Sequence, residues 1–242
     1  MNILWYDSID STNTEALRRL GEFASPVVLS AREQTAGRGQ RGNTWFSSPG
    51  QNLTFSIVLP FAQWHPMPAA DAPWLNFLAS YSVAAYLRET GVPCAIKWPN
   101  DIYAQRRKIC GMLVENTFAG AFLAASVVGI GLNVNQREFP QLANATSMAL
   151  LTGQSYSVEA CLEAFLAVFE RELARLFSSR EALFADYERL LFQRGVEATY
   201  RDLCSGGEFR GVIQGVEPDG RLRVMEGESA RYYRFKEISY IL

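Results

Sequence analysis

The chain has 242 residues, with 23 Lys and Arg against 25 Asp and Glu and a formal net charge of −2. That length supports one sizeable core and a small second module, and the near balance of charge disfavours a general nucleic-acid binder. No run approaches the ~18 consecutive apolar residues of a membrane span, and the acidic start MNILWYDSIDST lacks the features of a signal peptide. We therefore expect a soluble cytoplasmic protein that has neither DNA nor a membrane as a partner.

Cysteine and histidine usage excludes several chemistries. The four cysteines lie far apart with no CxxC pair, which fits reduced thiols in the cytosol. The only histidine, His65, lies in the proline-rich stretch 60–73, where we expect an exposed loop. One histidine cannot form a multi-histidine metal site, and a catalytic base needs a locked orientation that such a loop rarely provides.

The first half of the chain mixes helix and strand signals. Thr12-Asn13-Thr14-Glu15 is typical of a capping box and predicts a short helix that ends near Leu20. Four glycines and a proline among polar residues predict a long loop over residues 34–50. Apolar periodicity predicts strands at 26–32, 52–59 and 95–98 and a helix at 74–90.

The pattern then predicts a hairpin and two helices. Residues 108–116 and 121–133 are apolar on both faces, as in strands of a sheet covered by helices, and Ala119-Gly120 suits the turn between them. Helices are predicted to begin at Ser157 and, with a second capping box Ser178-x-x-Glu181, at Ser178. Each helix carries one apolar stripe, which indicates core packing.

The composition shifts at Gly195. The remaining residues are rich in Val, Ile, Tyr and Phe and are cut by turn signals, which predicts five short strands in a small barrel. We therefore expect two domains, residues 1–194 and residues 195–242.

The loop Gln34–Trp45 is the first segment with chemical content. Its glycines at 37, 39 and 42 let the backbone approach a ligand closely and offer amide hydrogens to anionic oxygens. Arg38 and Arg41 add bidentate donors for phosphate or carboxylate. On its own the segment is equally compatible with a flexible surface loop.

Three further segments carry polar groups beside predicted strands. Lys97-Trp-Pro-Asn-Asp101 offers a cation, an amide and a carboxylate, a set that suits a nucleotide with its Mg²⁺ or simply a capped turn. Lys108–Glu115 adds a second lysine. Gly129–Asn135 ends a strand with two glycines and two amides, and alone it would be a glycine-bearing strand with a bulge.

Taken in order, these segments closely resemble the biotin protein ligases, in which GRGRxGRxW, KWPND, KxxGILVE and GxGxN occur in sequence. The matching stretches are Gly37–Trp45, Lys97–Asp101, Lys108–Glu115 and Gly129–Asn133, with Asp10–Asn13 and Lys236–Ser239 also similar. The resemblance covers nearly the whole chain. It implies an α/β (α+β) fold, in which a mixed-sheet catalytic domain related to class II synthetases precedes a small C-terminal SH3-like β-barrel.

The resemblance also implies a two-step, ATP-dependent reaction. Biotin's carboxylate attacks the α-phosphate of ATP to give biotinyl-5'-AMP and pyrophosphate. A lysine of a biotin carboxyl carrier protein then attacks the mixed anhydride. Because two anions repel as they approach, cations must offset their charge.

By resemblance, the roles fall on particular residues. Lys108, Arg38 and Lys97 are expected to be catalytic, with Lys108 at the biotin carboxylate and the α-phosphate. The expected biotin-binding residues are Ser11, Thr12, Asn13, Gln34, Gly37, Arg38, Gly39, Gln40, Trp45, Lys108 and Gly111. The expected residues for ATP or the adenylate are Arg41, Lys97, Asn100, Asp101, Lys108 and Asn133, with Asp101 also expected to bind Mg²⁺ through water.

Two positions depart from the family's pattern, because Gln40 and Asn43 stand where the motif has arginines. The acyl-adenylate hydrolyses if water reaches it, so the glycine-rich loop should order over it as a lid. With two fewer guanidinium groups over the anhydride, we expect this enzyme to lose more biotinyl-AMP than its arginine-rich relatives do.

Three alternatives compete with a ligase that only biotinylates. A repressor would need an amino-terminal DNA-binding domain, and the Ser11 motif is expected to leave no room for one. A lipoate ligase pairs arginines with a double glycine and a later histidine, a setting that His65 lacks. A non-catalytic biotin-binding module would not need Lys108 and Asp101. The acceptor protein is not given by the sequence, and the oligomeric state, including a homodimer, is left open.

Overall fold

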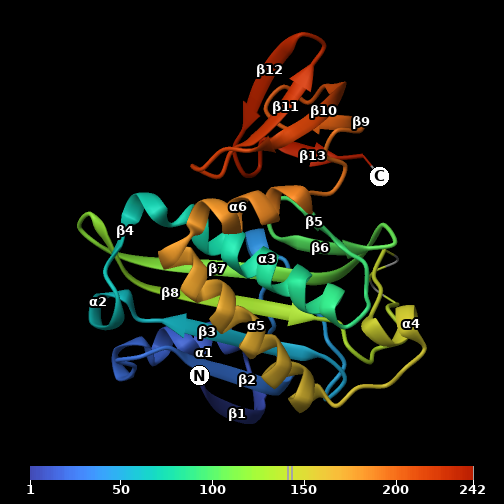
Figure 1. Cartoon of the computed structure of the whole chain (residues 1–242). Coiled ribbons are helices and arrows are strands. Elements are labelled where there is room, and N and C mark those ends of the chain that lie inside the picture. The colour runs from blue at the N-terminus through green and yellow to red at the C-terminus, as the bar shows by residue number, and fades with distance from the viewer. Residues whose placement is uncertain (141, 143, 242) are drawn as a thin grey trace.

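The computed structural model describes the chain except for residues 141, 143 and 242 and the side chain of Arg41. The described residues form two sheets and several helices, with the smaller sheet at the C-terminal end of the chain (Figure 1). None of the described helices is both long and apolar enough to cross a membrane.

The large sheet has eight strands. Seven strands lie side by side in the order β1-β2-β3-β8-β7-β6-β5, and β4 pairs with β8. Neighbouring strands are antiparallel except β1 and β2, which are parallel. The strands are β1 (Asn2–Ile9), β2 (Val27–Gln34), β3 (Leu53–Leu59), β4 (Met67–Pro68), β5 (Ala95–Lys97), β6 (Asp101–Ala104), β7 (Arg107–Ala119) and β8 (Phe122–Leu132).

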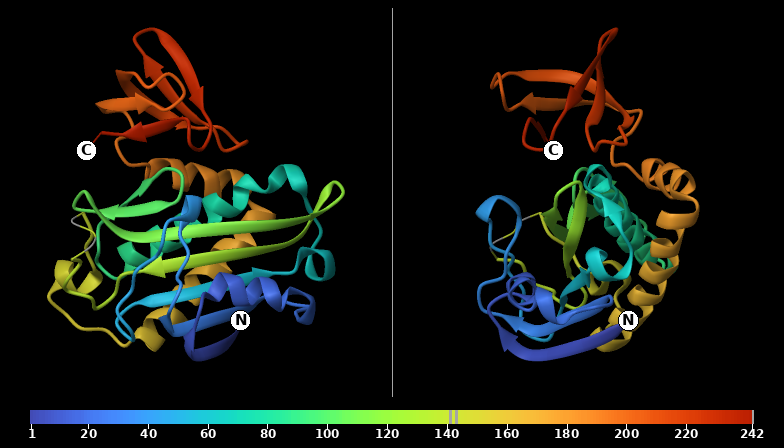
Figure 2. Two further views of the ribbon diagram at one scale, coloured as in Figure 1. Left: turned by 180° about the vertical axis from the view of Figure 1, so that it is seen from behind. Right: turned by 90° about the vertical axis from the view of Figure 1, so that its left-hand side faces the viewer.

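Helices cover both faces of this sheet, unequally. The long helices α3, α5 and α6 pack against one another over one face, whereas α1 lies on the other face beside the loop that follows β2 (Figure 2). The helices are α1 (Thr12–Arg18), α2 (Phe61–Trp64), α3 (Pro73–Glu89), α4 (Met148–Thr152), α5 (Val158–Ser178) and α6 (Arg180–Arg189), with 3₁₀ turns η1 (Leu20–Glu22), η2 (Gln40–Gly42) and η3 (Ala69–Asp71).

The main core fills the space between the sheet and the long helices. Every residue of β3 is buried, and Phe55 on this strand packs against Phe165 of α5 with their ring centroids 5.3 Å apart. Helix α3 is buried over most of its surface because the sheet lies beneath it and α5 and α6 lie against it. The other face of the sheet, under α1, is left for the cavity described below.

The C-terminal sheet has five antiparallel strands in the order β12-β11-β10-β9-β13. They are β9 (Glu197–Asp202), β10 (Glu208–Val216), β11 (Leu222–Glu226), β12 (Ser229–Tyr233) and β13 (Ile238–Tyr240). The sheet rests on α6, since Val216 N donates to Glu188 Oε1 at 3.1 Å. It also contacts the Lys97–Asp101 segment, since Trp98 Nε1 donates to the Gly220 carbonyl at 3.1 Å.

The predicted strands and helices are present, with local differences. Helix α1 is capped by Ser11, whose Oγ accepts from Thr14 N, so the cap lies one residue before the predicted Thr12. Helix α6 begins after Ser179, which makes no side-chain cap hydrogen bond, so the capping box predicted from Ser178 is wrong. The sequence patterns did not indicate β1 or β6.

Candidate active site

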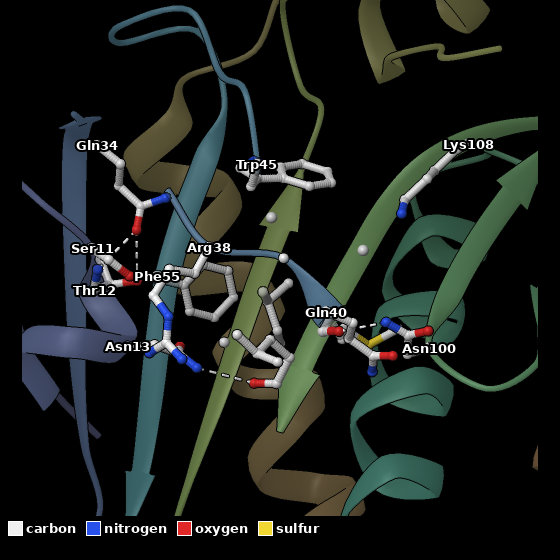
Figure 3. A pocket seen from close by; sticks show the side chains of 17 residues that line it. Ser11, Thr12, Asn13, Gln34, Arg38, Gln40, Trp45, Phe55, Asn100 and Lys108 are labelled. Carbon is white, nitrogen blue, oxygen red and sulfur yellow. Dashed lines mark hydrogen bonds between the residues drawn. The ribbon is translucent and has the colours of Figure 1, made fainter. Parts of the chain in front are cut away.

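A cavity of about 50 Å³ lies on the α1 face of the large sheet. Its walls come from the start of α1, the loop after β2, and strands β3, β7 and β8 (Figure 3). Eleven of the residues expected at a site line it: Ser11, Thr12, Asn13, Gln34, Arg38, Gly39, Gln40, Trp45, Asn100, Lys108 and Gly111. The sequence had therefore indicated most of this one cavity from segments far apart in the chain.

The floor of the cavity is made of glycines. Gly111 of β7 lies opposite Gly131 of β8, and Gly129 lies two residues before Gly131 on the same face. A Cβ at Gly131 would overlap the indole of Trp45, and a Cβ at Gly129 would overlap the side-chain amide of Asn13. Sequence reasoning assigned only Gly111 to the floor, although the two-residue spacing of the β8 glycines was the signal for the rest.

One end of the cavity is a polar network. The Gln34 side-chain oxygen accepts from Thr12 N at 2.8 Å. Ser56 of β3 contacts Thr12 Oγ1 at 2.8 Å and Asn13 Oδ1 at 2.5 Å through its buried hydroxyl. Ser56 was not predicted, because only the register of β3 against β8 brings it opposite Gly129. The network fixes the donors and acceptors that face the cavity before any ligand arrives.

Arg38 forms an ion pair with a carboxylate. Its Nη2 and Nη1 donate to the two oxygens of Glu115 at 2.7 and 3.1 Å. Glu115 Oε2 also accepts from Asn13 Nδ2 at 2.9 Å. Figure 3 shows Arg38 pointing toward Asn13, away from the side on which Lys108 lies. Glu115 was quoted within a motif but was not assigned to the site.

Lys108 has a carboxylate partner as well. Its Nζ lies 2.6 Å from Asp101 Oδ1 and 5.7 Å from the ring centroid of Trp45. Asp101 begins β6 and pairs in register with Gly111, so the ion pair stands at one end of the glycine floor. Arg38 and Lys108, the described cations that line the cavity, are therefore both paired in this state.

Lys97 lies outside the lining of this cavity. Its ammonium sits 4.7 Å from the ring centroid of Tyr240 and 5.1 Å from that of Tyr103. Burial lowers its pKa, and the charge of Lys108 lowers it further, while Asp101 acts in the opposite direction. The Lys97 ammonium is thus close enough to Lys108 and Asp101 to contribute to the electrostatic field around them, although it lies against the C-terminal sheet.

The other expected residues have local structural contacts. Asn100 Nδ2 donates to the Met112 carbonyl at 2.6 Å, and the buried Asn133 donates to the Thr146 carbonyl at 2.9 Å without lining the cavity. The Gly37 carbonyl accepts from Trp45 N at 2.9 Å, which closes the glycine-rich loop. The expectation for the Arg41 side chain falls outside the described part of the chain.

A metal cage built from protein side chains is not available in the described part of the chain. Among those residues, no group of three or more His, Cys, Asp or Glu side chains is arranged to hold an ion. A single carboxylate such as Asp101 suits Mg²⁺ that also keeps water and phosphate oxygens, since this ion is commonly bound in that way.

The fold and the cavity together are typical of an enzyme that binds a small acid between a glycine floor and a Gly/Arg loop. Arg38 and Lys108 supply positive charge in that cavity. Residues 5–133 match the model of the biotin/lipoate A/B protein ligase family. The chain belongs to that family.

Individual relatives extend the match beyond those residues. The bifunctional ligase/repressor BirA of Escherichia coli is 31% identical over 96% of this chain and 71% of its own length. The biotin–[acetyl-CoA-carboxylase] ligase of Paracoccus denitrificans is 29% identical over 92% of this chain and 93% of its own length. The biotin protein ligase of Aquifex aeolicus, solved in complex with biotin and ATP, superposes with a TM-score of 0.78 at 28% identity and covers 98% of this chain and 97% of its own.

Proposed function

We propose that this chain is an ATP-dependent biotin–protein ligase of the biotin–[acetyl-CoA-carboxylase] type. It forms biotinyl-5'-AMP and pyrophosphate from biotin and ATP, and then transfers biotin to a lysine of a biotin carboxyl carrier protein. The observation that carries this proposal is that Arg38 and Lys108, 70 positions apart, line one cavity. The names of the relatives from Paracoccus and Aquifex, which match nearly whole chain to whole chain, support it.

The two cations do the electrostatic work of the first step. A carboxylate oxygen of biotin attacks the α-phosphorus of ATP, the bond from that phosphorus to its bridging oxygen breaks, and pyrophosphate leaves. Lys108 offsets the charge where the two anions meet, and Arg38 contributes from the other side of the cavity. Lys97, outside the cavity lining, adds positive charge to the electrostatic field that acts on the two reacting anions.

The biotin end is assigned to the polar network and the loop. Ser11, Thr12 and Gln34 hold the ureido ring by hydrogen bonds. Trp45 supplies the apolar wall and Gly111 a floor without side-chain bulk. The glycine-rich loop closes the remaining side through Gly37, Gly39 and Gln40, and Asn13 lies beside it.

The nucleotide end is assigned to the residues beyond Lys108. Asn100 and Asn133 recognise the adenine side, and Arg41 contacts the phosphates. Asp101 would hold Mg²⁺ through water, and the ion would neutralise phosphate charge there. In the second step, the carrier lysine attacks the carbonyl carbon of the adenylate, AMP leaves, and the amine loses a proton.

We assign the catalytic unit to residues 1–194 and an SH3-like module to residues 195–242. The reaction needs only solutes and a carrier domain found in the cytoplasm, where we place the enzyme. No step of the proposed reaction involves DNA or a membrane.

A streptavidin blot tests the proposal. The full chain is incubated with biotin, ATP and a purified carrier domain, and pyrophosphate release is followed in parallel. Lys108→Ala should lower the rate of adenylate formation by about 100-fold or more, as removal of one transition-state donor does elsewhere, while circular dichroism stays unchanged. Wild-type enzyme that neither labels the carrier nor releases pyrophosphate would refute the assignment.

A further inference from the structure

Glu115 is a charged residue, bonded to the cavity-lining Arg38 and Asn13, that the proposed chemistry leaves without a role. It lies on β7, two residues beyond the cavity-lining Leu113 and on the same face. Its carboxylate accepts three hydrogen bonds, two from Arg38 and one from Asn13. One side chain therefore joins the glycine-rich loop and the start of α1 to the middle of the sheet.

The ion pair links the glycine-rich loop to β7. Arg38 belongs to the loop that follows β2, whereas Glu115 stands on β7, and strands β3 and β8 lie between β2 and β7. The cavity floor is made by β8 and β7. Any ligand seated on that floor therefore lies beside or beneath the Arg38 side chain.

The 37–45 loop is otherwise closed mainly on itself. Trp45 N donates to the Gly37 carbonyl at 2.9 Å, and Gly39 N donates to the Asn43 carbonyl at 2.7 Å. These backbone bonds shape the loop but do not attach it to the sheet. The attachments across the cavity come from side chains, namely the apolar contact of Trp45 with the glycine floor and the charged contact of Arg38 with Glu115.

The exposure of the two side chains indicates that the Arg38–Glu115 ion pair fixes the position of Arg38 more than it stabilises the fold. The Arg38 side chain is 42% exposed and that of Glu115 is 24% exposed. Ion pairs that water reaches in this way add little to the free energy of unfolding. Two parallel charged hydrogen bonds nevertheless fix the plane and place of a guanidinium. The negative charge is also needed to accept from Asn13 and Arg38 together.

We propose that Glu115 is a positioning residue for biotin binding and for retention of the adenylate: its carboxylate holds the Arg38 guanidinium, and with it the 37–45 loop, over the biotin cavity. The inference rests on the proposed ligase function. Without Glu115 the loop closes less firmly, so biotin binds more weakly and the adenylate escapes or hydrolyses sooner, while the phosphoryl-transfer step at Lys108 keeps its rate.

Glu115→Gln in the full chain tests this. The KM for biotin in ATP–pyrophosphate exchange should rise about tenfold, the size expected for one charged bidentate contact, and kcat should change less than about twofold. The half-life of bound biotinyl-AMP should fall, and added salt should shorten it in the wild type but not in the variant.

Glu115→Asp should recover part of the loss in biotin binding and in adenylate half-life. A lower KM for biotin in Glu115→Gln would overturn the proposal, because Glu115 would then be competing with the ligand for Arg38.

A double-mutant cycle separates positioning from a general structural role. If Glu115 acts through Arg38, Glu115→Gln should add no further rise in KM to an Arg38→Gln chain. Fully additive effects would refute the coupling. Glu208→Gln is the matched control, because Glu208 forms a 2.6 Å ion pair with Arg201 in the C-terminal sheet, and it should leave KM and half-life as in the wild type.

A measurement on the ligand-free chain separates this proposal from the proposed function. Trypsin should cleave within the 37–45 loop faster in Glu115→Gln than in the wild type, whether or not the chain activates biotin. Equal cleavage rates would refute the role of Glu115. An inactive wild type whose loop is still protected by Glu115 would count only against the ligase assignment.

Discussion

Each described cation that lines the cavity has a carboxylate partner: Arg38 pairs with Glu115, and Lys108 pairs with Asp101. Without these partners the two positive charges would repel each other in the absence of ligand. Because the Lys108–Asp101 pair is partly open to water, exchanging the Asp101 carboxylate for a ligand oxygen costs little. The site can therefore keep both charges paired at rest and still turn Lys108 to the reactants.

Gln40 offers the clearest single-residue prediction. It lines both the cavity and a neighbouring cleft of about 420 Å³ that reaches the C-terminal sheet, so it stands where the two spaces meet. Gln40→Arg should place a guanidinium over the anhydride and lengthen the half-life of bound biotinyl-AMP by about threefold or more. Rapid quenching of the isolated enzyme–adenylate complex measures this.

Asn43→Arg serves as the comparison, because Asn43 is exposed and does not line the cavity. It should change the half-life less than Gln40→Arg does. If Gln40→Arg leaves the half-life unchanged, the missing guanidinium does not control retention of the intermediate.

At the scale of elements, the hairpin of β7 and β8 is both scaffold and binding surface. Its pairing brings Gly111 opposite Gly131, and the indole of Trp45 lies on this surface. Side chains on the opposite face remain buried and apolar in the main core, as at Val128 and Leu132. One hairpin thus serves the core with one face and the cavity with the other.

Gly131→Ala tests this use of the hairpin. The added methyl group would overlap the Trp45 indole, and overpacking of this kind typically costs about 1–3 kcal/mol. We expect the KM for biotin to rise about tenfold or more, measured by pyrophosphate exchange. Gly21→Ala should be neutral, because no atom lies within 4 Å of the added carbon there. An unchanged KM in Gly131→Ala would show that the floor tolerates bulk.

Most helices and strands were predictable from the sequence, whereas the side-chain contacts that depend on how strands pair were not. Periodicity indicates β3, α3 and α5 because their apolar spacing persists over many residues. Ser56 and Glu115 escaped notice because their roles depend on strand register, which is set by tertiary pairing. Lys97 was grouped with Lys108 on sequence, yet the fold places its ammonium between Tyr103 and Tyr240.

At the scale of the whole molecule, the C-terminal sheet contacts the segment that carries the catalytic motif. Trp98 donates to the Gly220 carbonyl, and the next residue back, Lys97, lies against Tyr240 of β13. Asn100 and Asp101 follow directly in the chain. The position of these two site residues therefore depends on how the second sheet is docked.

The half-buried Lys97 ammonium at this junction predicts a pH dependence of stability. Burial lowers the pKa of Lys97 below its usual 10.5. The folded chain thus loses this proton at a lower pH than the unfolded chain does, and stability rises with pH wherever the unfolded state binds more protons. The free energy of unfolding of the wild type, less that of Lys97→Met, should therefore increase as the pH rises toward the usual lysine pKa of 10.5.

Urea unfolding followed by circular dichroism at several pH values gives this difference directly, because the other titrating groups are common to both chains. A difference that stays flat or falls as the pH rises would contradict the assignment of a desolvated ammonium to Lys97.

The small volume beside Trp45 has a kinetic consequence. Sites that hold small molecules commonly measure roughly 300–1,000 Å³, several times the 50 Å³ found here. A biotin molecule therefore fits only after Trp45 or the 37–45 loop moves outward, and the free energy of that movement weakens the apparent affinity for biotin. Substitutions that lower this free energy without contacting the ligand should tighten binding.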